Sequence, residues 1–153
     1  MSAAAPARAH GGAPLSGVLR ASPEDFRVIE KLGFAADGEG EHVLLTVRKR
    51  GLTTQQAAEV LARHAGVKPL AVGYAGMKDR HAVTEQAFTV QLAGRDEPDW
   101  QSLARDDIEV SGSQRHRRKL KRGALQGNTF VIVLRNVTGD RGAAERVLAA
   151  ISE

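Results

Sequence analysis

A single carboxylate between two cations marks the segment best suited to chemistry. The run Gly73–Gln86 reads GYAGMKDRHAVTEQ and places Asp79 between Lys78 and Arg80, on a stretch that contains two glycines. Glycine lets the backbone approach a ligand closely, and adjacent positive charge keeps a carboxylate ionised and nucleophilic. From residue types alone a surface turn with local ion pairs is the commoner explanation, because structural ion pairs produce the same pattern. Asp79 is therefore a candidate catalytic residue that needs a second line of argument.

A second segment is suited to contact a phosphate backbone. Residues 115–122 carry six positive charges and no acid, whereas the whole 153-residue chain has a net charge of only +4. The cations are Arg115, Arg117, Arg118, Lys119, Lys121 and Arg122, with His116 among them. Cations near phosphates gain Coulomb energy and release condensed counterions, which predicts RNA binding. The alternative is a solvated charged face.

The composition excludes several classes of site. The chain has no cysteine, so disulfides, thiolate metal sites and cysteine nucleophiles are excluded. Its five histidines are scattered without metal-ligand spacing, and we expect no metal site. No apolar run approaches the roughly 20 residues that cross a bilayer, so we expect a cytoplasmic protein rather than a membrane protein.

The alternation of apolar residues predicts an α+β fold. Strand patterns occupy residues 26–29, 43–47, 70–75, 84–92, 108–110 and 130–134, and we expect the first two to pair. Thr53 and Gln56 form a capping box that opens a helix ending at Gly66, and a second helix is predicted over residues 140–151. Residues 98–100 indicate a short helix or turn. Asp79 then lies on a loop, residues 76–81, between two extended elements.

The first residues differ in composition from the rest. Residues 1–17 are rich in Ala, Pro and Gly and have almost no large apolar side chains, so they cannot offset the entropy of ordering. We expect a disordered tail there, and a folded region over residues 18–153 that begins near Leu19.

Several runs together resemble one known family. The segment around Asp79 resembles the signature G-x-K-D-x-x-A-V-T-x-Q of the TruD family of pseudouridine synthases, with Asp79 in the position of the family's catalytic aspartate. The runs SPEDFRVIE (22–30) and GNTF (127–130) resemble the family's first and third motifs. Shorter runs at 38–42, 48–51 and 115–120 also look like family elements. The resemblance covers roughly residues 16–153, in the family's order.

The resemblance implies a set of roles. It makes Phe26, Asn128 and Phe130 substrate contacts, although from the residues alone two strand phenylalanines and an asparagine after glycine are more often structural. It implies that a uridine of tRNA, usually uridine 13, is isomerised to pseudouridine after leaving its stack, with no cofactor and no metal. Candidate contacts to the RNA backbone are Lys78, Arg80, Arg115, Arg117, Arg118, Lys119 and Lys121.

The chain also departs from the family. Family members continue through an inserted domain and return to complete the catalytic sheet, whereas this sequence stops at Glu153. We therefore interpret residues 18–153 as the N-terminal portion of the catalytic domain, in a fragment with little activity alone. A half-sheet leaves unpaired edges and exposed apolar faces.

Two other functions stay open at this point. A non-catalytic RNA-binding module would use the basic segment and leave Asp79 dispensable. A hydrolase using Asp79 with His81 is weaker, because two residues apart on a loop they need not face one another.

Overall fold

The computed structural model describes residues 9–152 and divides the chain into two compact units. The larger unit is Arg20–Val133, and the smaller one combines the two ends of the chain, up to Leu19 and from Leu134. All of the predicted site residues belong to the larger unit. The predicted α+β class is confirmed, and the sheet of the larger unit is mainly antiparallel.

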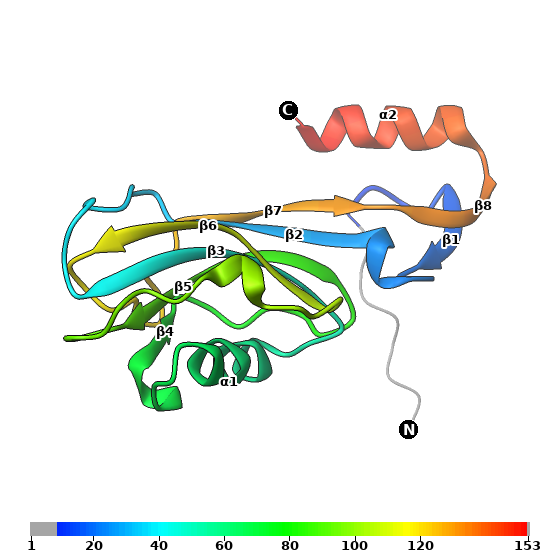
Figure 1. Ribbon diagram of the computed structural model, residues 1–153. Helices are drawn as coiled ribbons and strands as arrows, with labels where there is room; N and C mark the ends of the chain where they lie inside the picture. Colours follow the sequence, from blue (N-terminus) through cyan, green and yellow to red (C-terminus); the bar gives the residue numbers. More distant parts are fainter. Residues whose placement is uncertain (1–8, 153) are drawn as a thin grey trace, which may run out of the picture. The chain divides into compact units, whose positions relative to one another are not determined.

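The larger unit is built on a six-stranded sheet (Figure 1). Its strands are β2 (Phe26–Lys31), β3 (His42–Arg50), β4 (Val72–Tyr74), β5 (Val83–Gln91), β6 (Ile108–His116) and β7 (Gly127–Ile132). The order across the sheet is β6-β3-β5-β2-β7, and β4 pairs with β5 beside the end of β2. The predicted strands are therefore present, with β6 and β7 longer or shifted in their bounds.

Strand β5 occupies the centre of the sheet and determines where its neighbours lie. It runs antiparallel to β3 along its whole length and parallel to β2 over Val83–Glu85. The expected pairing of residues 26–29 with 43–47 is therefore wrong, because β5 lies between β2 and β3. Strand β5 is mostly buried, with Glu85 exposed and Ala87 and Gln91 half-buried, as expected for a strand in the middle of the sheet. The loop that carries Asp79 leads directly into this strand.

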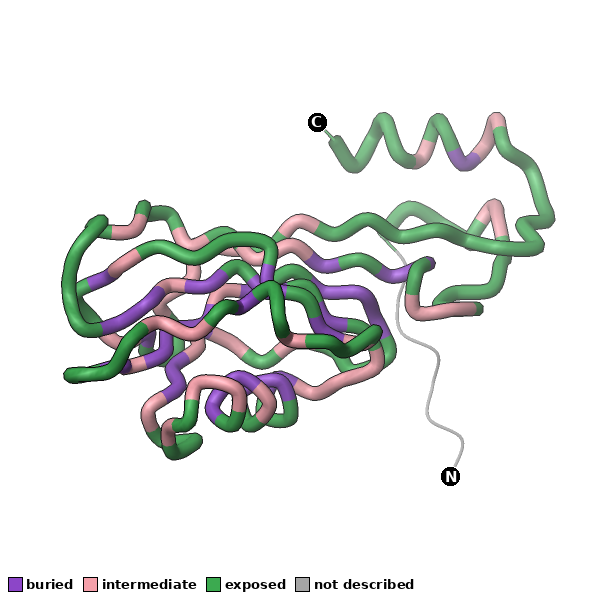
Figure 2. The backbone as a smooth tube through the Cα atoms, in the orientation of Figure 1, coloured by how far each residue is buried: buried purple, intermediate pink, exposed green. Residues whose placement is uncertain are grey.

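Helix α1 (Thr54–His64) packs on the sheet and closes the main core. Its start follows the predicted capping box: Thr53 Oγ1 accepts a hydrogen bond from Gln56 N, and Gln56 Oε1 accepts one from Thr53 N. The buried face of α1 meets apolar side chains of β3 and β5, such as Leu45 and Phe88. Figure 2 shows this burial concentrated in α1 and the strands beside it.

Three short 3-10 helices link the strands of the larger unit. They occupy Pro23–Asp25, Pro69–Ala71 and Trp100–Ser102. The third confirms the short helix expected near residue 98, with Asp99 as its N-cap. The second shortens the strand expected over 70–75, because Pro69 fixes a turn at its start.

The smaller unit pairs β1 (Leu15–Leu19) with β8 (Leu134–Gly139) in antiparallel fashion. Helix α2 (Arg141–Ser152) follows, and Asp140 Oδ1 accepts a hydrogen bond from Ala143 N at its start. Of the tail expected over residues 1–17, residues 1–8 lie outside the described part of the chain. Residues 15–17 belong to β1, so ordered structure begins earlier than Leu19, because β8 supplies hydrogen-bond partners that the local sequence does not reveal.

Candidate active site

Asp79 lies on the predicted loop between β4 and β5. Its side chain is 45% exposed, and its Oδ1 lies 3.5 Å from Nη2 of Arg20. Arg20 adopts a left-handed backbone conformation with φ of 57°, which costs a non-glycine residue on the order of 1–3 kcal/mol. Arg20 lies just before β2, and with this backbone conformation its side chain reaches the Asp79 loop. Arg20 was not among the residues predicted from sequence.

Arg20 connects the carboxylate to an aromatic pair. Its Cζ lies 3.9 Å from the centroid of the Phe26 ring, within cation–π distance. The Phe26 ring in turn meets the Phe130 ring edge-on, with centroids 6.0 Å apart. Asp79, Arg20, Phe26 and Phe130 therefore form one continuous chain of contacts.

The register of β2 and β7 brings the predicted substrate residues to one face. Phe130 is opposite Val28, and Asn128 is opposite Glu30. Because side chains alternate along a strand, Asn128 and Phe130 lie on the same side as Phe26. Phe26 is buried in a small cluster, whereas Phe130 is 53% exposed and Asn128 is also exposed. The sheet thus presents an aromatic ring and an amide that are free to meet a ligand.

The two cations next to Asp79 in sequence do not face its carboxylate. Lys78 Nζ is buried and lies 2.5 Å from Oε2 of Glu30 on β2. Arg80 Nε instead donates a hydrogen bond to the carbonyl of Gly51. We expected Lys78 and Arg80 beside the Asp79 carboxylate, but the loop directs both side chains elsewhere. Arg20 is the cation that contacts this carboxylate. Lys78, buried in an ion pair, is also unsuited to the phosphate contact expected of it.

A buried lysine supports the Asp79 loop from β3. Lys49 is 1% exposed, and its Nζ donates hydrogen bonds to the carbonyl of Leu52 at 2.6 Å and to that of Asp79 at 3.2 Å. Burial lowers the pKa of Lys49 to about 8, while the nearby Asp79 opposes this shift. Lys49 lies in the RKRG run, but a strand lysine in a basic run gives no sign that it is buried.

Polar side chains of the core hold the rest of the loop. Thr54 Oγ1 accepts a hydrogen bond from Lys78 N at 2.8 Å and donates one to Gln86 Oε1 at 3.1 Å. Gln86 Nε2 donates to the carbonyl of Gly76 at 2.5 Å. Thr54 and Gln86 are both buried. These hydrogen bonds fix the backbone on both sides of Met77 to α1 and β5, so Asp79 is presented by a well-anchored loop.

The basic segment is less uniform than its sequence indicates. Arg115 lies at the end of β6 with its Nε 3.6 Å from Glu97, and Arg117 pairs with Glu39. Lys119 donates to the carbonyl of Leu70. In the part of the chain that the structure describes, the cations of this segment whose side chains form neither an ion pair nor a hydrogen bond are Arg118, Lys121 and Arg122.

The surroundings of Asp79 give no support to a hydrolase pair or a metal site. His81 is exposed, and no hydrogen bond within residues 9–152 joins it to Asp79. Among the same residues no group of three or more His, Asp or Glu side chains is arranged to hold a metal ion. No helix in this range has the length and hydropathy needed to cross a membrane.

Comparison with known proteins agrees with the sequence resemblance. The family model for tRNA pseudouridine synthase D (TruD) matches residues 7–153. The chain is 55% identical over 144 residues to tRNA pseudouridine synthase D of Methylococcus capsulatus, covering 94% of this chain and 41% of the relative. It is 52% identical over 145 residues to the protein of the same name from Xanthomonas campestris pv. campestris, covering 95% of this chain and 40% of that one.

A solved structure matches the fold as well. The crystal structure of a putative tRNA pseudouridine synthase D from Methanosarcina mazei aligns with a TM-score of 0.74 and 28% sequence identity, covering 90% of this chain and 31% of that one. The chain thus spans about 40% of the length of the curated relatives it matches. Because the family model matches nearly the whole chain and the relatives exceed 50% identity, this chain belongs to the TruD family of tRNA pseudouridine synthases.

Proposed function

We propose that this chain supplies the reacting carboxylate of a tRNA pseudouridine synthase, and that this carboxylate is Asp79. The observation that carries the proposal is the series of contacts from Asp79 through Arg20 to Phe26 and Phe130. It joins a carboxylate with a cationic partner to a half-exposed aromatic ring. Family membership supports the reaction class, and the family's usual target makes uridine 13 of tRNA the proposed substrate.

The reaction rearranges one nucleotide without an external group. The bond between ribose C1′ and uracil N1 breaks, the base turns while bound, and C5 joins C1′. C5 loses its proton and N1 gains one, so atoms and electrons balance without a cofactor. Asp79 acts either by attacking C1′ or by removing a sugar proton to give a glycal, and both routes need the ionised carboxylate.

The exposed side chains of β7 suit the detached uracil. Phe130 offers a face on which the base stacks, and Asn128 offers an amide that hydrogen-bonds to its edge. The buried Phe26 supports this surface, because its ring contacts both the Phe130 ring and the Arg20 guanidinium. The target base must leave its stack in the RNA to reach Asp79, at a cost of a few kcal/mol. Contacts between the protein and the RNA backbone offset that cost.

The proposed partner is tRNA, in the cytoplasm. Of the cations predicted to contact the RNA backbone, Arg118 and Lys121 are best suited to phosphates, because they have no ion pair within residues 9–152. Arg80, Arg115, Arg117 and Lys119 are proposed as weaker contacts, since each already has a protein partner. Such contacts strengthen binding without reading the sequence.

We further propose that the 153-residue chain has little activity alone. Strand β7 is an edge of the sheet, and Val131, on the opposite face from Phe130, is 43% exposed. An apolar edge strand of this kind is ordinarily covered in a finished fold. Full turnover of unmodified tRNA by the 153-residue chain would contradict this part of the proposal.

Replacing Asp79 with asparagine tests the assignment. In the intact protein, Asp79→Asn keeps the shape but removes the charge, so we expect pseudouridine formation to fall by about 1,000-fold or more while tRNA affinity changes little. The matched control is Asp96→Asn, an exposed aspartate on the loop after β5, which should leave both unchanged. Equal loss of binding and conversion, or normal conversion, would favour the non-catalytic RNA-binding module instead.

A further inference from the structure

A hollow of about 500 Å³ lies beside the end of β6, away from Asp79. Its lining combines one exposed aromatic ring, apolar side chains and cations. The lining residues include Phe34, His116, Arg118, Leu120, Lys121 and Ala124. An exposed aromatic ring beside apolar side chains and cations is typical of surfaces that bind single-stranded nucleic acid.

The aromatic wall of this hollow is held in place. The Phe34 ring stacks on the His116 ring, with centroids 5.7 Å apart and planes 17° from parallel. His116 is buried, and its Nδ1 lies 2.9 Å from Oδ2 of Asp37. The backbone N–H of Arg117 donates to the same carboxylate and lowers the pKa of Asp37. Phe34 itself stays 44% exposed, so its ring retains surface that no protein group covers.

Glycine permits the close approach that builds this wall. Gly40 has φ of 118°, and a Cβ at this position would collide with the carbonyl of His116 and the Cα of Arg117. Residues 34–40 can therefore fold over the end of β6 because position 40 has no side chain. The loop that carries Phe34 is thus placed against the basic segment by the fold itself.

The charge beside the ring is positive and available. Arg118 and Lys121 line the hollow and form no ion pair within residues 9–152, although the charge of Arg118 helps to lower the pKa of Asp37 nearby. The nearby acids are already engaged, Asp37 with His116 and Glu39 with Arg117. A ligand that suits both features must carry a flat ring and a negative charge. A nucleotide has both in one compact unit, whereas a purely acidic run such as polyglutamate offers charge without a ring to stack.

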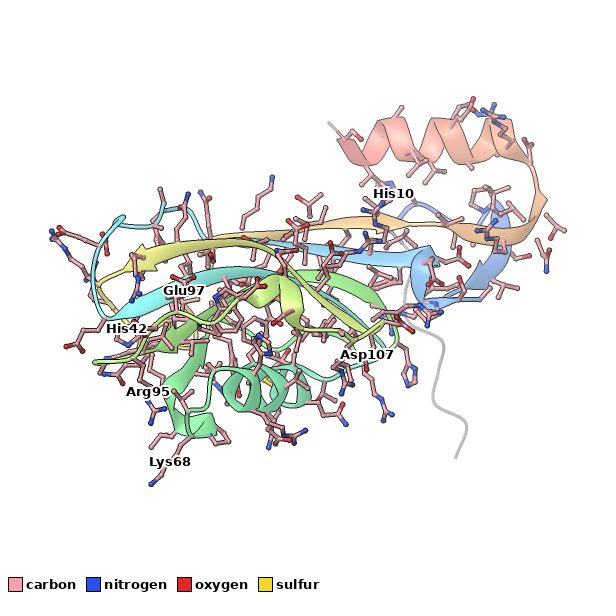
Figure 3. The ribbon with its side chains drawn as sticks, in the orientation of Figure 1. His10, His42, Lys68, Arg95, Glu97 and Asp107 are labelled. Carbon is pink, nitrogen blue, oxygen red and sulfur yellow. The ribbon has the colours of Figure 1, made fainter. Side chains whose placement is uncertain are left out.

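The hollow is too far from Asp79 to hold the same nucleotide. His116 is paired with His42 at one end of β3, and Lys49, which contacts Asp79, lies near the other end. The two positions are seven residues apart, which is roughly 23 Å along an extended strand. Figure 3 shows His42 at one end of the sheet and Asp107, next to the start of β6, at the other.

We propose that this hollow binds a second, unpaired nucleotide of the RNA substrate, with its base on Phe34 and its phosphate between Arg118 and Lys121. This inference rests on the proposed function only in taking the RNA to be tRNA. Because the site is remote from the carboxylate, it contributes to affinity and to the choice of RNA, not to the bond-breaking step.

The test compares two replacements of Phe34 in the intact protein. Phe34→Ala removes the ring, whereas Phe34→Tyr keeps a ring that can stack. We expect Phe34→Ala to weaken tRNA binding by about 5- to 160-fold, the range for removal of one base–aromatic stack, and Phe34→Tyr to bind within about twofold of the wild type. The single-turnover rate at saturating tRNA should be the same in all three proteins.

Several outcomes would overturn the proposal. Unchanged binding by Phe34→Ala would do so, as would equally weakened binding in the alanine and tyrosine variants. Equal weakening of binding to polyglutamate and to tRNA would indicate an acidic protein partner instead. If Phe34→Ala proves unfolded by circular dichroism, the double variant Arg118→Gln, Lys121→Gln takes its place, and unchanged tRNA affinity in that variant would refute the site.

The same assays separate this inference from the proposed function. If the wild type forms no pseudouridine on any tRNA but Phe34→Ala still weakens RNA binding, the proposed function fails and the nucleotide site stands. If the wild type is active and Phe34→Ala binds normally, the proposed function stands and the nucleotide site fails.

Discussion

The two ends of β3 use positive charge in opposite ways. Near Arg50, the lysines Lys49 and Lys78 are buried and bound to the Asp79 carbonyl and to Glu30. Near His42, Arg118 and Lys121 stand on the surface beside an exposed ring. Burial makes the first pair part of the scaffold that presents a carboxylate. Exposure leaves the second pair free for a ligand, although Lys49, like Arg118 and Lys121, lies in a basic run of the sequence.

The largest effect should come from breaking the buried ion pair. Lys78→Met removes the only cation beside the buried Glu30 carboxylate among residues 9–152 and leaves it the backbone N–H of Ala87 as a hydrogen-bond donor, so we expect the free energy of unfolding to fall by about 3–5 kcal/mol, measured by denaturant titration. The matched control is Arg117→Met, which breaks the exposed pair with Glu39 and should change stability by less than about 1 kcal/mol. Similar destabilisation of the two variants would remove the contrast between the two ends of β3.

A smaller and pH-dependent effect is expected at Lys49. Lys49→Met removes the hydrogen bonds to Leu52 and Asp79, at a cost of about 1–3 kcal/mol at pH 10, where the amine is mostly neutral. Because burial lowers the folded-state pKa to about 8, the unfolded chain holds an extra proton up to about pH 10.4. The stability of the wild type relative to Lys49→Met should therefore rise from pH 8 to pH 10. A flat or falling difference would mean that the lysine is not buried as described.

The smallest effects concern single phosphates. Replacing Arg118 or Lys121 with glutamine should reduce the slope of log affinity against log salt by roughly 0.7–0.9 for each phosphate that the variant no longer neutralises. Arg115→Gln should change the slope less, because Arg115 already faces Glu97. Filter binding of tRNA at several salt concentrations measures this. Equal slope changes in the three variants would show that an ion pair with a protein carboxylate does not prevent a cation of this segment from contacting RNA phosphates.

Local signals are enough to predict much of the scaffold. The Thr53–Gln56 capping box locates α1, alternation locates β3 and β5, and the glycines and charges around Asp79 locate its loop. Each of these features depends on residues close together in the chain, so each can be predicted without knowledge of the tertiary fold.

The remaining features depend on contacts between distant residues. Arg20 and Asp79 are 59 residues apart, and their meeting requires β2 to lie parallel to β5, which no local pattern indicates. The buried position of Lys78 likewise depends on Glu30 on β2. Consecutive strands often pair, which favours β2 beside β3, but the later strand β5 takes the position between them.

The most direct measurement is the structure of the intact protein bound to tRNA that carries 5-fluorouridine at the target position, where fluorine cannot leave C5 as a proton does. We predict an Asp79 carboxylate oxygen within about 3.5 Å of C1′ of that nucleotide, with the base against Phe130 and Asn128. A target sugar bound far from Asp79, with the base away from Phe130, would contradict the assignment of Asp79 as the reacting carboxylate.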